Sequence, residues 1–333
     1  MRRLTAACET WDLAKPFAIS SGVIDCLTVL VVQVEADGFV GRGEGVPSGA
    51  RMVSRADGQR IAERARVAIS DVRSAVEGGL EPEELLTVMP AGPARNALDC
   101  ALWDLRAKQT GSPVPRLLGV ELPELLVTAH TIALWDLEQV RADAYRHRES
   151  PLFKIKLGGS HDLESVAAVR ELAPDARIIV DVNGGWSVDR LAQTAPGLAR
   201  LGVELIEQPL APEADHQLAG FESPVPLCAD ESCQVRGDLE RIGERYDSVN
   251  VKLDKTGGLT EAIALAREAR RRDLGVMVGC MAGTSLSMAP ASIIAGLCDY
   301  VDLDGPLLLR DDRPDGFRYQ NGRYRPLNPQ LWG

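Results

Sequence analysis

The chain has 333 residues, of which 45% are hydrophobic and 26% charged, and its 37 basic and 48 acidic side chains leave a formal net charge of −11. This composition is typical of a globular protein and excludes a disordered or fibrous one. A net negative chain with no block of lysine or arginine lacks the positive surface that phosphate backbones and anionic lipids require. We therefore expect neither nucleic acid nor a membrane surface as a partner.

The N-terminus and the cysteines indicate where the protein works. The first residues contain no apolar segment followed by a cleavage site, so they are interpreted as mature sequence. Seven cysteines form an odd number without a CxxC pair, which favours free thiols in a reducing compartment over a disulfide framework. We therefore expect a cytoplasmic protein.

The first 118 residues predict a small α+β domain. The alternating segment 26–45 predicts a β-hairpin that turns at Asp37 and Gly38. Helical spacing of apolar residues then predicts helices over about 56–77 and 94–109. We expect the tail 310–333, which is rich in Arg, Asp and Pro, to return to this domain.

Residues 119–309 predict a barrel. Short runs rich in β-branched residues recur at nearly constant intervals and alternate with amphipathic helical segments. Eight such strands favour an α/β fold of the parallel TIM-barrel type over a doubly wound open sheet. The helical segment before 248 is the weakest of the series. The predicted strands are 125–132, 153–157, 177–182, 203–208, 226–230, 248–253, 275–280 and 300–305.

Three acidic residues follow at the C-terminal ends of three consecutive predicted strands: Asp181, Glu207 and Asp230. Active sites of parallel barrels lie at this edge. Buried together, the three carboxylates would repel one another unless a cation balanced them. Oxygen ligands without His or Cys select Mg²⁺, or Mn²⁺, over zinc. One such residue could simply cap the next helix, but three at equivalent positions predict a metal site.

Lysine is scarce, and its positions are informative. The 37 basic residues include only six lysines, and arginine cannot act as a base because it does not give up its proton. Lys154 and Lys156 end the second barrel strand, and Lys252 ends the sixth. We expect these lysines to face each other across the carboxylates. Proximity to Mg²⁺ and to other ammonium groups would lower a lysine pKa toward the working pH.

Two opposed lysines predict a stereochemical outcome. A neutral lysine could remove a proton α to a carboxylate, while the metal stabilises the charge that develops on the carboxylate. If the second lysine returns a proton to the other face, the configuration inverts, so the reaction is a racemisation or epimerisation. Asp302 and Asp304 share one face of the eighth strand, where they could bind a substrate ammonium or form a solvated turn.

Several motifs together resemble the enolase superfamily, over essentially the whole chain. They are KIK at 154–156, DVN at 181–183, EQP at 207–209, ADES at 229–232 and VKLDKTGGLTEA at 251–262. The chain is most similar to the muconate lactonizing subgroup. PAGPARNALDCALWDL at 90–105, CADESC at 228–233 and DLDGP at 302–306 resemble its dipeptide epimerases, especially the L-Ala-D/L-Glu epimerases.

The resemblance implies a modified TIM barrel, (β/α)7β, under an N-terminal α+β cap, with Mg²⁺ at the three carboxylates and Lys156 and Lys252 as the acid and base. It implies that the dipeptide is bound by Thr131, Lys154, Asp302 and Asp304, with Cys280 and Ala282 in the pocket wall. It also suggests a role in murein-peptide (peptidoglycan) recycling.

One departure concerns the second residue of the dipeptide. The glutamate-selective members are expected to carry an arginine in the first cap loop, whereas this chain has FAISSGVIDC at 17–26. Ser20 and Ser21 could donate hydrogen bonds, and Arg51 or Arg55 of the second cap loop could compensate. Losing a charge-assisted partner costs about 1 to 3 kcal/mol, which shifts selectivity tenfold or more.

Other functions stay open from the sequence. An N-acylamino-acid racemase or a cycloisomerase could use the same residues on substrates without an ammonium group. A Schiff-base aldolase also carries its lysine on a barrel strand, and a non-catalytic metabolite-binding barrel would share the fold. The sequence leaves open the oligomeric state, including a homo-oligomer, and which lysine acts on which epimer.

Overall fold

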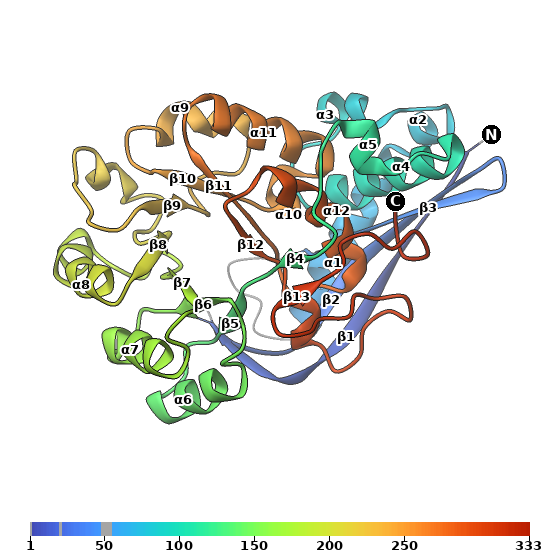
Figure 1. The fold of residues 1–333 in the computed structure, drawn as a ribbon. Helices are drawn as coiled ribbons and strands as arrows, with labels where there is room; N and C mark the ends of the chain where they lie inside the picture. The colour runs from blue at the N-terminus through green and yellow to red at the C-terminus, as the bar shows by residue number, and fades with distance from the viewer. Residues whose placement is uncertain (1, 20–21, 48–54) are drawn as a thin grey trace.

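Two sheets organise the protein, whose computed structural model describes residues 2–19, 22–47 and 55–333. Strands β1, β2 and β3 form an antiparallel sheet, and eight parallel strands form a nearly closed barrel in the order β12-β11-β10-β9-β8-β7-β6-β5. A small third sheet pairs β13 with β4. Figure 1 shows the antiparallel sheet and helices α1 to α5 gathered beside the barrel. Within the described residues, no helix combines the length and apolar character that crossing a membrane requires.

The N-terminal elements match the α+β unit expected from the sequence. The chain turns between β2 and β3 at Asp37 and Gly38, which both have positive φ (54° and 81°), as a two-residue hairpin turn requires. The helix expected over 56–77 is interrupted, because α1 ends at Asp71 and α2 begins at Arg73. The elements are β1 Arg3–Ile19, β2 Gly22–Ala36, β3 Phe39–Gly45, α1 Arg55–Asp71, α2 Arg73–Glu77, η1 Pro82–Glu84, α3 Leu85–Val88, α4 Pro93–Thr110 and α5 Val114–Leu118.

Three alternating glycines let β3 lie directly against α4. A Cβ atom added to Gly41, Gly43 or Gly45 would come within 2.1 Å of a backbone carbonyl oxygen in α4. No side chain fits into so short a distance, because the clash is with backbone that cannot move aside. The GRGEG sequence therefore fixes how closely the sheet and its main helix pack.

The barrel strands agree with the predicted runs except the first. Only its end, β5, joins the barrel, and the preceding residues form β4, which pairs antiparallel with β13 from the C-terminal tail. The strands are β4 Leu126–Val127, β5 His130–Ile132, β6 Leu152–Lys156, β7 Arg177–Asp181, β8 Val203–Glu207, β9 Leu227–Ala229, β10 Ser248–Val251, β11 Gly275–Gly279, β12 Tyr300–Asp302 and β13 Arg323–Tyr324.

Helical segments connect consecutive barrel strands. Because side chains alternate along a strand, Ile179, Leu205, Cys228 and Met277 fill the barrel interior while their neighbours pack against the helices. The segment before β10 is short, with η3 and the four-residue α9, but the segment before β9 contains only η2, so the prediction that the former is the weakest is wrong. The helices are α6 Leu137–Arg146, α7 Asp162–Leu172, α8 Val188–Arg200, η2 Asp215–Leu218, η3 Arg236–Asp238, α9 Leu239–Ile242, α10 Leu253–Thr256, α11 Leu259–Arg271, α12 Ser285–Ile294, η4 Ala295–Leu297 and η5 Gly305–Leu308.

The tail beyond residue 309 runs back over the N-terminal elements. The backbone N–H of Arg310 donates to the carbonyl oxygen of Asp12 at 2.9 Å. The guanidinium of Arg313 contacts Glu44 of β3 at 2.7 Å, and the indole N–H of Trp332 donates to the carbonyl oxygen of Cys100 at 3.0 Å. The tail thereby ties the antiparallel sheet and α4 to the barrel.

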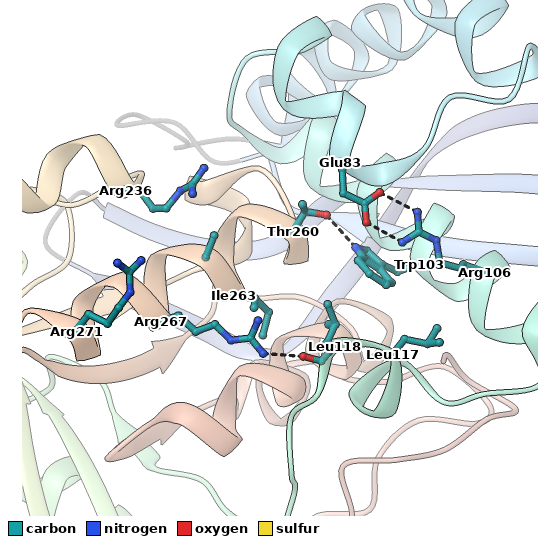
Figure 2. Close-up of a pocket in the computed structure, with 11 residues that line it drawn as sticks. Glu83, Trp103, Arg106, Leu117, Leu118, Arg236, Thr260, Ile263, Arg267 and Arg271 are labelled. Carbon is teal, nitrogen blue, oxygen red and sulfur yellow. Dashed lines mark hydrogen bonds and ion pairs between the residues drawn. The ribbon is translucent and has the colours of Figure 1, made fainter.

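Helices α4 and α11 meet along the seam between the two units. The indole N–H of Trp103 donates to the hydroxyl of Thr260 at 2.9 Å, and Thr260 in turn donates to the buried carboxylate of Asp99. Figure 2 shows the surface cleft of about 560 Å³ at this seam. Its arginines already have partners: Arg106 with Glu83, Arg236 with Glu261, Arg267 with the carbonyl of Leu118, and Arg271 with Glu268.

Candidate active site

The three predicted metal ligands lie side by side. Asp181 ends β7 and is in register with Glu207, which ends β8, and Asp230 follows β9 on the next strand. All three side chains are almost completely buried. Parallel strands of similar length bring their C-terminal residues to one edge, so the spacing of the sequence motifs becomes a continuous acidic row.

The two predicted catalytic lysines flank this row at opposite ends. Lys156 ends β6, and its Nζ lies 2.6 Å from Oδ2 of Asp181. Lys252 follows β10, and its Nζ lies 2.6 Å from Oδ2 of Asp230. Glu207 lies between the two pairs. The structure therefore brings two amines to either side of one acidic centre, as the sequence predicts.

Lys154 lies in the middle of the site. Its Nζ is 2.6 Å from Glu207, 2.8 Å from Asp302 and 3.0 Å from Asp181. The side chain is buried and bridges the acidic row to β12. Its predicted contact with a substrate carboxylate stays a prediction.

Thr131 joins Asp302, the last residue of β12, to Asp304, which follows two residues later. Its backbone N–H donates to Oδ2 of Asp304 at 2.7 Å, and its hydroxyl donates to Oδ1 of Asp302 at 3.2 Å. Burial, and after it the charge of Asp302, raises the pKa of Asp304 to about 6. The residues that the sequence assigns to the substrate ammonium thus form one group.

The predicted pocket wall lies next to this group. Gly279, the last residue of β11, is in register with Asp302, so Cys280 and Ala282 follow at the same edge of the barrel. Both are partly buried against the core. Burial raises the pKa of the Cys280 thiol well above its usual value, and the charges of Asp302 and Asp304 add to the effect.

Two residues that contact the acidic row were not predicted as site residues from the sequence. The Nζ of Lys255 lies 2.6 Å from Oδ1 of Asp230 and also donates to backbone carbonyls. Asn250 donates to Oε1 of Glu207 at 2.7 Å. The scarcity of lysine could have drawn attention to Lys255, and Asn250 stands two residues before Lys252, on the same face of its strand.

A second polar chain leads away from Lys156. Its Nζ donates to Oδ1 of Asn183 at 2.8 Å, and the amide of Asn183 donates to Oε1 of Glu231 at 3.2 Å. Oε2 of Glu231 is buried and accepts no hydrogen bond from a described residue. Asn183 of the DVN motif and Glu231 of the ADES motif are therefore hydrogen-bonded to each other, and Asn183 orients the amine of Lys156.

The pKa values reflect competition between burial and the neighbouring charges. Burial alone would lower the pKa of Lys252, but the charges of Asp230 and Glu207 outweigh it and raise the pKa above its usual range. This direction reflects the carboxylates alone; the lowered lysine pKa expected from the sequence depends on bound Mg²⁺ and stays a prediction. Burial, and after it the charge of Asp181, raises the pKa of Glu207 to about 7.

The donor set fits a hard divalent cation. Oε2 of Glu207 is buried and accepts no hydrogen bond from the described residues, although the ammonium of Lys154 lies nearby. Six carboxyl groups stand against four amines here, so the fully ionised cluster carries a formal excess of two negative charges. The residues are Asp181, Glu207, Asp230, Glu231, Asp302, Asp304, Lys154, Lys156, Lys252 and Lys255. Oxygen donors with this excess charge suit Mg²⁺.

The structure does not describe the cap-loop side chains that are expected to select the second residue of the dipeptide. Ser20, Ser21, Arg51 and the side chain of Arg55 lie outside the described residues.

Comparison with known families agrees with this geometry. Residues 1–119 match the model of the mandelate racemase / muconate lactonizing enzyme N-terminal domain, and residues 137–330 match the enolase C-terminal domain-like model. An acid-lined barrel beneath an antiparallel cap is thus an enolase-superfamily fold. The chain belongs to the mandelate racemase / muconate lactonizing enzyme family, which confirms the resemblance drawn from its motifs.

Curated relatives are epimerases and racemases by name. An L-Ala-D/L-Glu epimerase of Escherichia coli K12 is 40% identical over 97% of this chain and 99% of its own. An N-acetyl-D-glutamate racemase of a Pseudoalteromonas species is 45% identical over 76% of this chain and 80% of its own.

Two solved structures share the whole architecture. An enolase family member from Agrobacterium tumefaciens, with homology to dipeptide epimerases and with bound sodium and L-Ala-L-Glu, is 43% identical, with a TM-score of 0.93 and full coverage of both chains. A dipeptide epimerase from Cytophaga hutchinsonii, in complex with Mg and D-Ala-L-Val, is 26% identical, with a TM-score of 0.83, and the match covers 97% of this chain and 92% of that one.

Proposed function

We propose that this protein is a Mg²⁺-dependent dipeptide epimerase that inverts the α-carbon of the C-terminal residue of an L-Ala-Xaa dipeptide, with glutamate as the expected second residue. The observation that carries the proposal is the placement of Lys156 and Lys252 at opposite ends of the row formed by Asp181, Glu207 and Asp230. Relatives named L-Ala-D/L-Glu epimerase and structures with bound dipeptides support it.

The proposed mechanism follows from this placement. One lysine removes the α-proton of the substrate and the other delivers a proton to the opposite face, so the configuration inverts. Mg²⁺ held by Asp181, Glu207 and Asp230 would supply Lewis-acid stabilisation of the charge that develops on the substrate carboxylate, and it would balance the carboxylate charge that raises the pKa of Lys252. Lys154 stays charged beside Asp302 and orients the substrate carboxylate.

The substrate ammonium is assigned to the group formed by Thr131, Asp302 and Asp304. Thr131 holds both carboxylates in place through its backbone N–H and its hydroxyl. Two carboxylates so close together repel each other, and a bound ammonium removes that repulsion. Cys280 and Ala282 form the adjacent pocket wall. We also propose that residues 1–118, completed by 310–333, cap the barrel of residues 119–309.

A second candidate is an N-acylamino-acid racemase, which acts on substrates without an ammonium. It is favoured by the relative named N-acetyl-D-glutamate racemase and by the raised pKa of Asp304, about 6, since a protonated carboxyl could donate to an acyl oxygen. The curated relatives reported above are named epimerases and racemases, which gives no support to a Schiff-base aldolase.

The deciding experiment compares α-deuterium incorporation from D₂O into L-Ala-L-Glu, a library of other L-Ala-L-Xaa dipeptides and N-acetyl-L-glutamate, each with Mg²⁺. We expect the dipeptides to exchange fastest. Asp304→Asn should lower their kcat/KM by about 10- to 100-fold through the lost charge-assisted contact, with metal affinity unchanged. A preference for N-acetyl-L-glutamate would replace this proposal with the racemase, and no exchange in any substrate would indicate a binding protein.

Metal removal tests the cation directly. We expect a chelator to abolish deuterium incorporation and added Mg²⁺, or Mn²⁺, to restore it. Activity that survives the chelator, together with borohydride trapping of a lysine adduct, would support the aldolase instead.

The cellular setting follows from the same assignments. We propose a cytoplasmic enzyme that acts on small dipeptides released in murein recycling, and neither on nucleic acid nor at a membrane, consistent with its negative charge.

A further inference from the structure

A second cluster of potential metal ligands lies outside the barrel mouth, between β5 and α6. Nε2 of His130 is 2.9 Å from Oδ2 of Asp143, and Nε2 of His147 is 3.7 Å from Oδ1 of the same carboxylate. One ligand atom from each residue lies within 4.8 Å of the other two. Figure 1 shows β5 and α6 as neighbours on this side of the protein.

The fold places these side chains together. Side chains alternate along a strand, so Thr131 faces the candidate active site while His130 faces α6. Asp143 and His147 are four residues apart at the end of α6 and therefore share one face of the helix. Phe153 packs edge-on against the ring of His130, with ring centroids 5.8 Å apart, and holds it toward Asp143.

The cluster is enclosed but reachable from solvent. The exposed fractions of the side chains are 14% for His130, 11% for Asp143 and 36% for His147. Asp143 also lines a surface cavity of about 330 Å³ together with Trp135, Gln139, Lys15 and Arg146, and the guanidinium of Arg146 lies 3.9 Å from Oδ1 of Asp143. An ion could therefore reach the cluster without opening the barrel.

The donor chemistry differs from that of the barrel mouth. Two imidazole nitrogens and one carboxylate suit Zn²⁺, Co²⁺ or Ni²⁺, whereas the oxygen-only row suits Mg²⁺. We propose that His130, Asp143 and His147 form a second metal site that binds a divalent transition-metal ion such as Zn²⁺, with solvent completing its coordination. The inference does not depend on the proposed function.

Binding changes both the hydrogen bonding and the ring arrangement of the cluster. The rings of His130 and His147 are stacked, with centroids 3.8 Å apart and an angle of 21° between their planes, and parallel rings do not direct both nitrogens at one ion. When Nε2 of His130 takes the ion, its hydrogen bond to Asp143 is broken and its proton passes to solvent, while the packing of Phe153 keeps the ring in place. His147, at the C-terminal cap of α6 and the most exposed of the three, turns about its side-chain bonds to bring Nε2 to the ion.

The test is a titration of the full-length protein with Zn²⁺ or Co²⁺ while excess Mg²⁺ saturates the carboxylate row. Calorimetry should show one equivalent of Zn²⁺, and Co²⁺ should give the visible absorption of an ion with nitrogen ligands. We expect His147→Ala to weaken binding at least tenfold, roughly the effect of losing one ligand contact. Because His147 is partly exposed, this variant should keep its thermal unfolding midpoint.

Two control variants establish whether the ion binds at this cluster or elsewhere on the protein. His216→Ala removes an exposed histidine distant in the sequence and should leave Zn²⁺ binding unchanged. Asp230→Asn removes a ligand of the carboxylate row and should also leave it unchanged. The proposal is overturned if Zn²⁺ does not bind at 100-fold excess over protein. It is also overturned if both His130→Ala and His147→Ala bind Zn²⁺ as tightly as wild type, or if Asp230→Asn abolishes binding.

Discussion

Two regions can be compared through their buried carboxylates, the seam between the N-terminal elements and the barrel, and the barrel mouth. At the seam, neutral donors satisfy Asp99 and Asp254: Asp99 accepts from the backbone N–H and the hydroxyl of Thr260, and Asp254 accepts from Val46 and Asn96. At the barrel mouth, Asp181 and Asp230 instead contact several ammonium groups, and Glu207 keeps one oxygen without a hydrogen bond. The seam is complete within the chain, whereas the mouth holds charge that a ligand can balance.

This contrast separates structural carboxylates from functional ones. Both groups are buried, so burial alone does not distinguish them. In both regions burial raises a carboxyl pKa to about 7, at Asp99 and Asp254 in the seam and at Glu207 in the mouth. The distinguishing feature is the partner: hydrogen bonds from neutral groups fix a structure, while opposed charges with unsatisfied oxygens favour binding and proton transfer.

The largest effects are expected at the mouth. Lys156→Ala and Lys252→Ala should each lower the rate of epimerisation by about 10³-fold or more, because each removes a group that transfers a proton. Each variant should still exchange the α-proton of one epimer, since the remaining lysine faces that proton. Deuterium incorporation measured separately from the L,L and L,D dipeptides checks this.

A matched lysine tests whether charge alone matters. Lys15→Ala removes an exposed lysine and should leave both exchange rates within a factor of two of wild type. Equal residual exchange of both epimers in each of the two mouth variants would show that the lysines do not act on opposite faces.

The next largest effect is the pH dependence of stability that the seam produces. Burial raises the pKa of Asp99 from 3.8 to about 7 despite the hydrogen bonds from Thr260. Between those pH values the folded state binds a proton that the unfolded state has released, so the free energy of unfolding falls as pH rises from about 4 to 7. A shift of this size corresponds to at most about 4 kcal/mol.

Asp99→Asn should flatten this slope, because asparagine carries no charge at any pH in this range. Urea unfolding at pH 4.5, 6 and 7.5 measures this slope. The free energy of unfolding should vary less with pH in the variant than in wild type. An unchanged slope would assign the pH dependence to other groups, Asp254 among them.

The sequence predicted contacts between the ends of neighbouring strands better than contacts between distant segments, for a physical reason. Parallel strands deliver their last residues to one edge, so Asp181, Glu207 and Asp230 could be placed together from strand order alone. The contact of Lys255 with Asp230 depends on the turn of α10, and the pairing of β4 with β13 joins segments about 200 residues apart. Neither follows from local patterns, because both are set by how distant parts of the chain pack.

The smallest expected effect is Thr260→Val, which keeps the shape of the side chain and removes one hydroxyl from the seam. That hydroxyl accepts from the indole of Trp103 and donates to Asp99. Its loss leaves a largely buried indole N–H without its acceptor and should cost about 1 to 2 kcal/mol of unfolding free energy. The cost should be larger at pH 7.5 than at pH 4.5, since an ionised Asp99 depends more on its donor than a protonated one. As a control, Thr87→Val at an exposed position should lower the free energy of unfolding by less at both pH values. If both variants lower it equally, the hydroxyl of Thr260 contributes no more to stability than an exposed one.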